Sequence, residues 1–196
     1  MTVLSDNFNA NSTASWVNDS GVLTVDRNDS NTAQFEAGAS PNVARYGTAQ
    51  DNSTHYSQAQ VVVRSNSYQG LTARASSVRF FALLVQGTGN ETAQTFKREA
   101  STWTQLGTTA ITFSSGDIWR LDCSGVGVGT VTTAKQNDSV LHTGAPSDTD
   151  FDILTGVGMT SDNSAAELDN WQSDVLDAGA PAVSVRFSLA ATGAGR

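Results

Sequence analysis

The sequence predicts an all-β protein whose strands form an antiparallel sandwich or barrel. About a dozen short runs, either apolar or alternating between apolar and polar residues, are separated by clusters of Gly, Ser, Asn and Asp. None of them shows the period of an amphipathic helix. Short polar side chains compete for backbone hydrogen bonds and β-branched threonine packs well on a pleated surface, so this composition also disfavours long helices. Many short strands joined by turns are typical of sandwiches and barrels.

Length and charge narrow the classes of function. A chain of 196 residues fits a single β-sandwich domain. The formal net charge is −8, whereas a nucleic-acid surface requires clustered lysines and arginines. The same charge repels anionic membranes, and no apolar run reaches the roughly 18 residues of a membrane span. We therefore expect neither nucleic acid nor a membrane as a partner.

The first half of the chain contains five expected strands. Pro41 stands at the entrance of one of them, where its missing N–H is tolerated. The Val-Val-Val run before Arg64 is the strongest β-branched signal. The segment VRFFALLV is the most apolar and is too short for an average helix without caps, which predicts a central strand. These strands are expected at 21–25, 42–46, 57–64, 70–75 and 78–85.

The second half repeats this pattern. Trp119, Leu121 and Cys123 alternate with more polar residues, as in a half-buried strand, and Arg120 and Asp122 on the other face form an expected cross-strand or solvent pair. Strands 102–106, 117–123 and 130–135 are separated by turn residues and predict a β-meander. The other expected strands are 93–98, 156–160 and 166–171, with a further strand following the acidic residues of 148–154.

Several residues invite a chemical role and have a simpler explanation. Cys123 lies on the apolar face of its strand and is expected to be a buried, inert thiol. The glycines of 125–129 lack the Lys-Ser/Thr and the helix of a phosphate loop, so we expect a bulge or turn. His55 and His142 have no nucleophile nearby in the sequence and are expected at the surface.

A set of framework residues resembles concanavalin A-like lectin and glucanase domains of the laminin-G type. The set runs in order from Asp6-Asn7-Phe8 and Trp16, through Phe96, Trp103–Leu106 and Gly116–Leu121, to a polar hairpin at 136–139 and Leu168–Trp171. The resemblance implies a two-sheet jelly roll in which the first and last strands pair. It covers roughly residues 5–175, and we assign residues 1–176 to this domain. Because such folds host lectins, hydrolases, adhesins and viral structural proteins, function has to be argued from sites.

The candidate sites are few. The glucanases of this fold carry a Glu-x-Asp-x-x-Glu strand, and the glutamates here are isolated, so we expect no enzyme. Tyr46, Tyr56 and Tyr68 lie in or near loops and are candidates for a glycan groove, with ordinary packing as the alternative. The four tryptophans are candidates by type. No cofactor is expected.

Calcium is the one metal to consider, because it takes carboxylate oxygens and jelly rolls often hold it. Asp148, Asp150 and Asp152 alternate like loop ligands, but the Gly and distal Glu of a calcium loop are absent, which favours a solvated acidic turn. The resemblance instead implies Asp6 and Asp169 as a structural metal pair.

The last twenty residues, 177–196, read as a linker and a strand-forming arm. Val183, Val185, Phe187 and Leu189 alternate with polar residues and are the candidate partner-binding residues. Such a strand can add to the edge of a neighbouring subunit, or pack on its own sandwich.

The sequence-based hypothesis for function is an assembly protein. No secretory segment follows Met1, which together with the arm and the missing catalytic motifs favours a phage capsid decoration protein. It would be assembled in the host cytoplasm into the virion, as a homo-oligomer bound to the major capsid protein or another virion subunit. The alternative is a glycan-binding module or adhesin, and a glucanase-like hydrolase is third.

Overall fold

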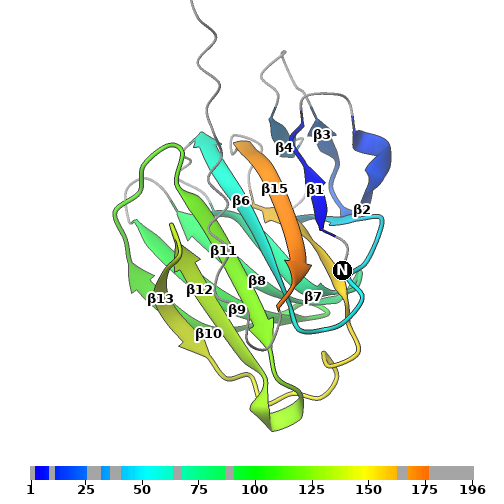
Figure 1. Cartoon of the computed structure of the whole chain (residues 1–196), viewed down its shortest axis with the longest axis vertical. Coiled ribbons are helices and arrows are strands. Elements are labelled where there is room, and N and C mark those ends of the chain that lie inside the picture. Colours follow the sequence, from blue (N-terminus) through cyan, green and yellow to red (C-terminus); the bar gives the residue numbers. More distant parts are fainter. Residues whose placement is uncertain are drawn as a thin grey trace, which may run out of the picture.

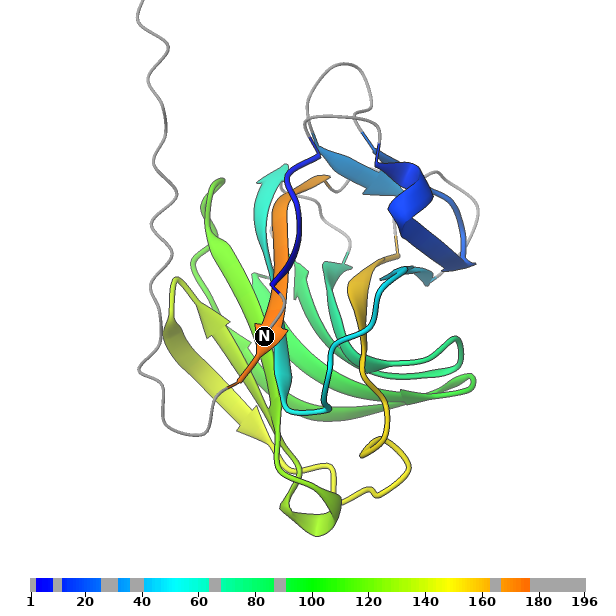
Figure 2. The ribbon, with the colours of Figure 1, turned by 45° about the vertical axis from the view of Figure 1, so that its right-hand side comes forward.

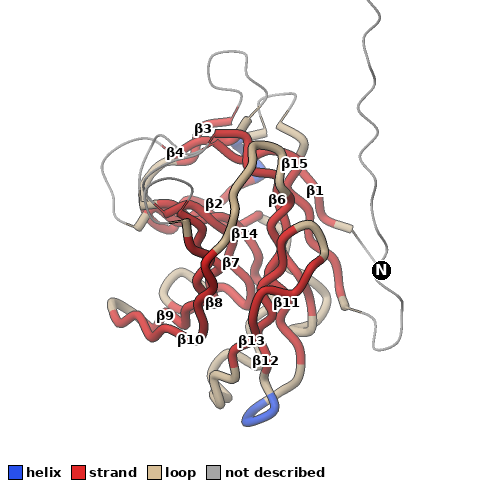
Figure 3. The backbone as a smooth tube through the Cα atoms, turned by 90° about the vertical axis from the view of Figure 1, so that its left-hand side faces the viewer, coloured by secondary structure: helices blue, strands red, loops and turns tan. Residues whose placement is uncertain are grey.

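Two antiparallel β-sheets packed face to face make up the described part of the chain. The computed structural model describes residues 3–8, 12–25, 32–35, 41–63, 68–86, 91–162 and 167–176. Figure 3 shows the two layers nearly edge-on, with β11, β12, β13, β6, β15 and β1 in one and β7, β8, β9, β10 and β2 in the other. The sandwich class predicted from the sequence is thereby confirmed.

The first sheet has the strand order β13-β12-β11-β6-β15-β4-β3, and β1 pairs with β15 (Figure 1). Its strands are β1 (Leu4–Asp6), β3 (Leu23–Val25), β4 (Ala33–Phe35), β6 (His55–Val63), β11 (Ile118–Ser124), β12 (Val131–Gln136), β13 (Ser139–Gly144) and β15 (Glu167–Val175).

The second sheet has the order β10-β9-β8-β7-β14-β5-β2. Figure 2 shows its strands β7 to β10 bending as they cross the molecule. Helical structure among the described residues is limited to short 3-10 turns, and none of it is long and apolar enough to cross a membrane. The strands are β2 (Trp16–Ser20), β5 (Asn42–Tyr46), β7 (Tyr68–Ala75), β8 (Arg79–Gln86), β9 (Thr92–Glu99), β10 (Thr102–Ala110) and β14 (Gly156–Ser161).

The main core lies between the sheets. Trp119, Leu121 and Cys123 are fully buried there, as their alternation predicts. Burial raises the pKa of the Cys123 thiol to about 12, so the thiol is protonated and inert at neutral pH. Arg120 and Asp122, on the outer face of the same strand, pair with each other, and Asp122 also pairs with Lys135 at 2.6 Å.

The first and last strands of the sandwich pair, as the resemblance implies. Leu4 lies opposite Ser173, and Asp6 lies opposite Trp171. A bulge at Asn170, whose φ is 49°, shifts the register of β15, so that Leu168 and Trp171 both face the core although they are three positions apart. Strict alternation would have placed them on opposite faces.

The predicted meander is wrong in one respect. Strands β11, β12 and β13 follow one another in the first sheet, but β10 belongs to the second sheet, beside β9. The connection 111–117 therefore crosses from one layer to the other. Sheet membership depends on partners far away in the sequence, which the local turn signals do not identify.

One loop agrees with expectation and a second differs from it. Of the bulge or turn expected at residues 125–129, the structure has a turn, the 3-10 turn Gly127–Gly129, and the Gly127 N–H donates to Asp152 Oδ2 at 2.7 Å. The acidic segment 148–154 forms turns with no strand. Its carboxylates are used in ion pairs: Asp148 with Lys97 at 2.7 Å, Asp150 with Arg79 at 3.2 Å, and Asp152 with Arg74 at 3.4 Å.

Both histidines are more buried than predicted. His55 begins β6 and is fully buried, with Nδ1 bonded to Asn52 O at 2.8 Å and Nε2 accepting the Arg74 N–H at 3.1 Å. Burial lowers the pKa of His55 to about 4. His142 lies in β13 between Thr95 and Thr109, where burial lowers its pKa. Long-range packing produces both positions.

Candidate functional site

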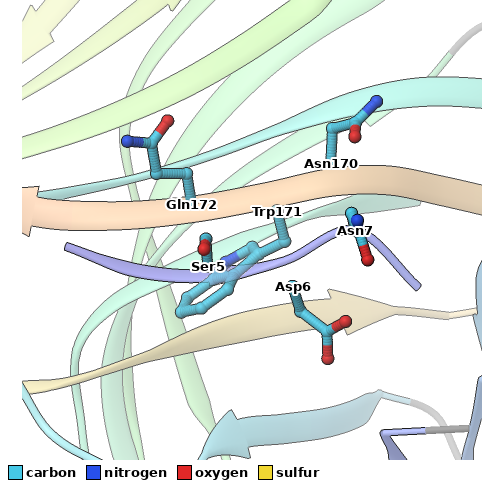
Figure 4. A pocket seen from close by; sticks show the side chains of 6 residues that line it. All are labelled: Ser5, Asp6, Asn7, Asn170, Trp171 and Gln172. Atoms are coloured by element: carbon cyan, nitrogen blue, oxygen red, sulfur yellow. The ribbon is translucent and has the colours of Figure 1, made fainter. Parts of the chain in front are cut away.

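Two hollows among the described residues are candidates for a binding site. The first lies where β1 meets β15, has a volume of about 320 Å³, and is lined by Ser5, Asp6, Asn7, Asn170, Trp171 and Gln172. Figure 4 shows that Asn170 and Gln172 point to one side of β15, whereas Asp6 and Trp171 point to the other. The polar groups of this hollow therefore do not converge on a common point, as those of a binding pocket do.

Asp6 in this hollow accepts hydrogen bonds from three residues that follow it in the chain. Its carboxylate accepts hydrogen bonds from the Phe8 N–H at 2.9 Å, the Ser12 hydroxyl at 2.5 Å and the Trp16 Nε1–H at 2.8 Å. Asp169 is bonded to the N–H and the amide of Asn170. With both oxygens of Asp6 taken by donors, this pair does not fit the metal role that the resemblance implies. Among the described residues, no group of three or more His, Cys, Asp or Glu is placed to hold a metal ion.

The second hollow lies on the outer face of the second sheet, and we call it the outer groove. The central strand β8 explains why it is apolar, because both of its faces carry apolar side chains. Phe81, Leu83 and Val85 belong to the core between the sheets, whereas Phe80, Ala82 and Leu84 form a separate cluster on the outer face. The outer groove has a volume of about 220 Å³ and is lined by Pro41, Tyr68, Leu84, Trp103, Thr160, Ser161 and Asp162.

Trp103 is the main aromatic group of the outer groove. It is half-buried and packs against the buried ring of Phe80, with ring centroids 5.6 Å apart and planes at 79°, and against Phe96 at 5.7 Å and 88°. Edge-to-face packing of this kind is favourable for aromatic rings and fixes their orientation. The indole is therefore held in place by the sheet while part of its surface stays open to the groove.

Polar groups stand on the β7 and β14 side of the outer groove. The Tyr68 hydroxyl accepts a hydrogen bond from Gln94 Nε2 at 3.3 Å, and Tyr68 O accepts the N–H of Asp162 at 3.0 Å. Asp162 is exposed at the end of β14, and partial desolvation raises the pKa of its carboxyl group. The groove thus combines aromatic and apolar surface with a few polar groups, which is the composition of small-ligand sites.

A cation lies beside Trp103. Arg98 on β9 is directly opposite Phe80 of β8 and Trp103 of β10 in the strand register. Its guanidinium carbon is 5.2 Å from the Phe80 ring centroid and 5.7 Å from that of Trp103. Burial lowers the pKa of Arg98, consistent with a cation that has lost part of its hydration.

The structure separates the three tyrosines predicted from the sequence. Tyr68 lies in the outer groove. Tyr46 packs between the sheets, with its ring centroid 5.0 Å from that of Trp171, and Tyr56 lies on the outer face of the first sheet, 3.9 Å beneath the Arg120 guanidinium. The structure therefore does not bring the three tyrosines together in one groove. Of the four tryptophans, Trp16, Trp119 and Trp171 are core residues, and Trp103 is the one that lines the outer groove.

Four residues in or beside the outer groove are not predicted from the sequence: Arg98, Leu84, Thr160 and Asp162. A usable signal was present in β8, because an apolar run on both faces of a strand needs cover on both sides. Val183, Val185, Phe187 and Leu189, the candidate partner-binding residues of the arm, lie outside the described residues.

Comparison with known proteins identifies the fold. No family model and no curated protein sequence matches the chain. Among solved structures, it is similar to a β-glucanase of Bacillus licheniformis (TM-score 0.63, 9% identity, covering 90% of this chain and 99% of that one). It is similar to carbohydrate-binding module CBM66 of Bacillus subtilis (0.57, 10%, 80% and 91%). A galectin-like Bacillus subtilis protein of unknown function also matches (0.66, 9%, 87% and 94%). These similarities confirm a jelly roll of the concanavalin A-like and galectin-like kind.

Proposed function

We propose that this protein is a non-catalytic glycan-binding module that holds sugar rings in the outer groove. The observation that carries the proposal is Trp103, a half-buried indole fixed by two ring contacts and facing a groove that also contains Tyr68 and Asp162. A sugar ring offers an apolar C–H face to an indole and hydroxyl donors to a carboxylate. Similar folds that carry carbohydrate recognition in their names support the same conclusion.

Binding is proposed in place of hydrolysis because of the carboxylates. Glycoside hydrolysis uses a pair of carboxyl groups about 5 to 10 Å apart across the scissile bond. Asp162 is the one carboxylate among the described residues that line the outer groove. The capsid decoration hypothesis depends on the arm at 183–189, outside the described residues, and no observation here supports it.

The test is a glycan array followed by calorimetry on the full chain. We expect binding of at least one oligosaccharide, and Trp103→Ala to weaken it by about 2 kcal/mol, or roughly 30-fold, as for a central aromatic contact. Tyr56→Ala is the matched control, because this ring lies on the opposite sheet. An array without hits, or equal losses in the two variants, would count against the proposal. Release of reducing ends from a bound glucan would show a hydrolase instead.

A further inference from the structure

Among the lysines and arginines that the structure describes, Arg98 alone has no carboxylate partner. In the part of the chain that the structure describes, Arg45, Arg74, Arg79, Lys97, Arg120 and Lys135 each form an ion pair with a carboxylate, and Arg98 forms none. Its Nε atom is buried without a hydrogen-bond partner. The absence is notable in a chain with 19 acidic and 11 basic residues.

Two aromatic rings lie beside the Arg98 guanidinium, and neither of them neutralises its charge. Phe80 is fully buried, and the Arg98 guanidinium lies over it and near Trp103. Stacking on aromatic rings uses the face of a guanidinium, whereas its N–H donors point outward in its own plane. Those donors match the two oxygens of a planar carboxylate in a bidentate pair.

Resting on the proposed function, we propose that the outer groove takes an acidic glycan and that Arg98 binds the carboxylate of a uronic acid residue in it. The cross-strand row Phe80, Arg98 and Trp103 sets this cation next to the indole that stacks a sugar ring. A ring on Trp103 therefore brings a neighbouring carboxylate within reach of Arg98. The protein's net charge of −8 does not prevent this contact, since at physiological salt charges are screened beyond about 8 Å.

The same cation also suits a sulfate ester, so the experiment must separate the two anions. The array carries trimers of glucose, galactose and mannose, the corresponding trimers of glucuronate, galacturonate and mannuronate, and sulfated forms of the neutral trimers. Calorimetry on the tightest uronate and on its carboxyl-reduced counterpart then measures the contribution of the carboxylate. This second comparison needs no variant of the protein.

The expected result is a preference of about tenfold or more for a uronate over its carboxyl-reduced counterpart, the size of a charge-assisted hydrogen bond. Arg98→Gln should remove the preference, so that the uronate and its carboxyl-reduced counterpart bind with equal affinity. The matched control is Arg79→Gln, which makes the same change of charge at a residue paired with Glu99 and Asp150. Thermal unfolding of each variant checks that it folds.

The outcomes separate the two proposals. Equal affinity for the uronate and the neutral trimer, with loss of both in Trp103→Ala, would overturn the acidic-glycan inference and leave the proposed function standing. Tighter binding of the sulfated trimers than of the uronates would overturn the assignment of a carboxylate. The absence of any glycan ligand would overturn the proposed function and this inference together.

Discussion

Replacing Arg74 with methionine should destabilise the sandwich more than the loss of any surface ion pair. Arg74 is fully buried, although it follows Ala73, which is also in the core. The strand register explains both positions: a bulge opposite Gly156 and Val157 leaves Arg74 as the extra residue, with φ 45°. The bulge directs the guanidinium to the loops at one end of the sandwich.

The expected loss follows from the contacts of the guanidinium. It donates to Ser53 O at 2.7 Å, Gly125 O at 2.5 Å and Thr130 Oγ1 at 3.2 Å, and it pairs with Asp152 at 3.4 Å. Removing one partner of a buried ion pair costs about 3 to 5 kcal/mol, and each carbonyl left without a donor costs about 1 to 3 kcal/mol. Because the Asp152 side chain is 20% exposed and water can reach it, we expect about 4 kcal/mol for Arg74→Met.

Urea unfolding followed by tryptophan fluorescence measures this loss, since Trp119 and Trp171 are buried and change their environment on unfolding. Arg79→Met is the control, because Arg79 and its partner Glu99 are both 39% exposed and an exposed pair contributes about 0 to 1 kcal/mol. Equal destabilisation by the two substitutions, or a loss below about 1 kcal/mol for Arg74→Met, would refute the reasoning from burial.

Three further predictions concern buried groups. The His55 pKa is about 4 against an ordinary value of 6.5. Between these values the unfolded chain binds a proton that the folded chain does not. Stability should therefore fall by about 3 kcal/mol as pH falls from 6.5 to 4, and pH titration of His55→Gln should lack this component of the slope. Asp6→Asn weakens the acceptor of three donors and should cost about 1 to 3 kcal/mol, whereas added Ca²⁺ should leave the Tm of the natural chain unchanged. Cys123 should react with a thiol reagent only after denaturant is added, and rapid labelling of the folded protein would contradict its burial.

The strands could be predicted from the sequence because their signals are local. The range 42–46 matches the observed β5, and Pro41 correctly marks its entrance. The Gly and Asn clusters mark strand ends for the same reason, since they supply turn conformations. The buried histidines could not be predicted in this way. His55 is placed by Arg74 and Asn52, and the first of these is distant in the sequence and depends on a bulge.

Only part of the candidate site can be predicted from the sequence. Residue type alone identifies Tyr68 as a candidate, whereas Trp103 is one of four tryptophans that the sequence does not separate into core and site residues. Alternation assigns residues to the two faces of a strand, but it does not say which face meets the other sheet. Arg98 becomes a candidate binding residue only because the strand register places it between Phe80 and Trp103.

On the outer face of the second sheet, the residues proposed to bind a ligand also cover buried apolar side chains of the fold. Val43, Phe80 and Ala82 on this face are fully buried, although the other sheet packs against the opposite face. The side chains of Trp103 and Arg98 pack over the Phe80 ring of this apolar cluster. A leucine or methionine at position 98 could also cover Phe80. Either side chain would avoid the unpaired charge of Arg98 and its buried Nε, which has no hydrogen-bond partner. The desolvation cost of these two polar features would then be absent. Arg98→Met should therefore leave stability unchanged or raise it while removing the preference for uronates, and a variant that lost stability by several kcal/mol would assign Arg98 to the fold instead.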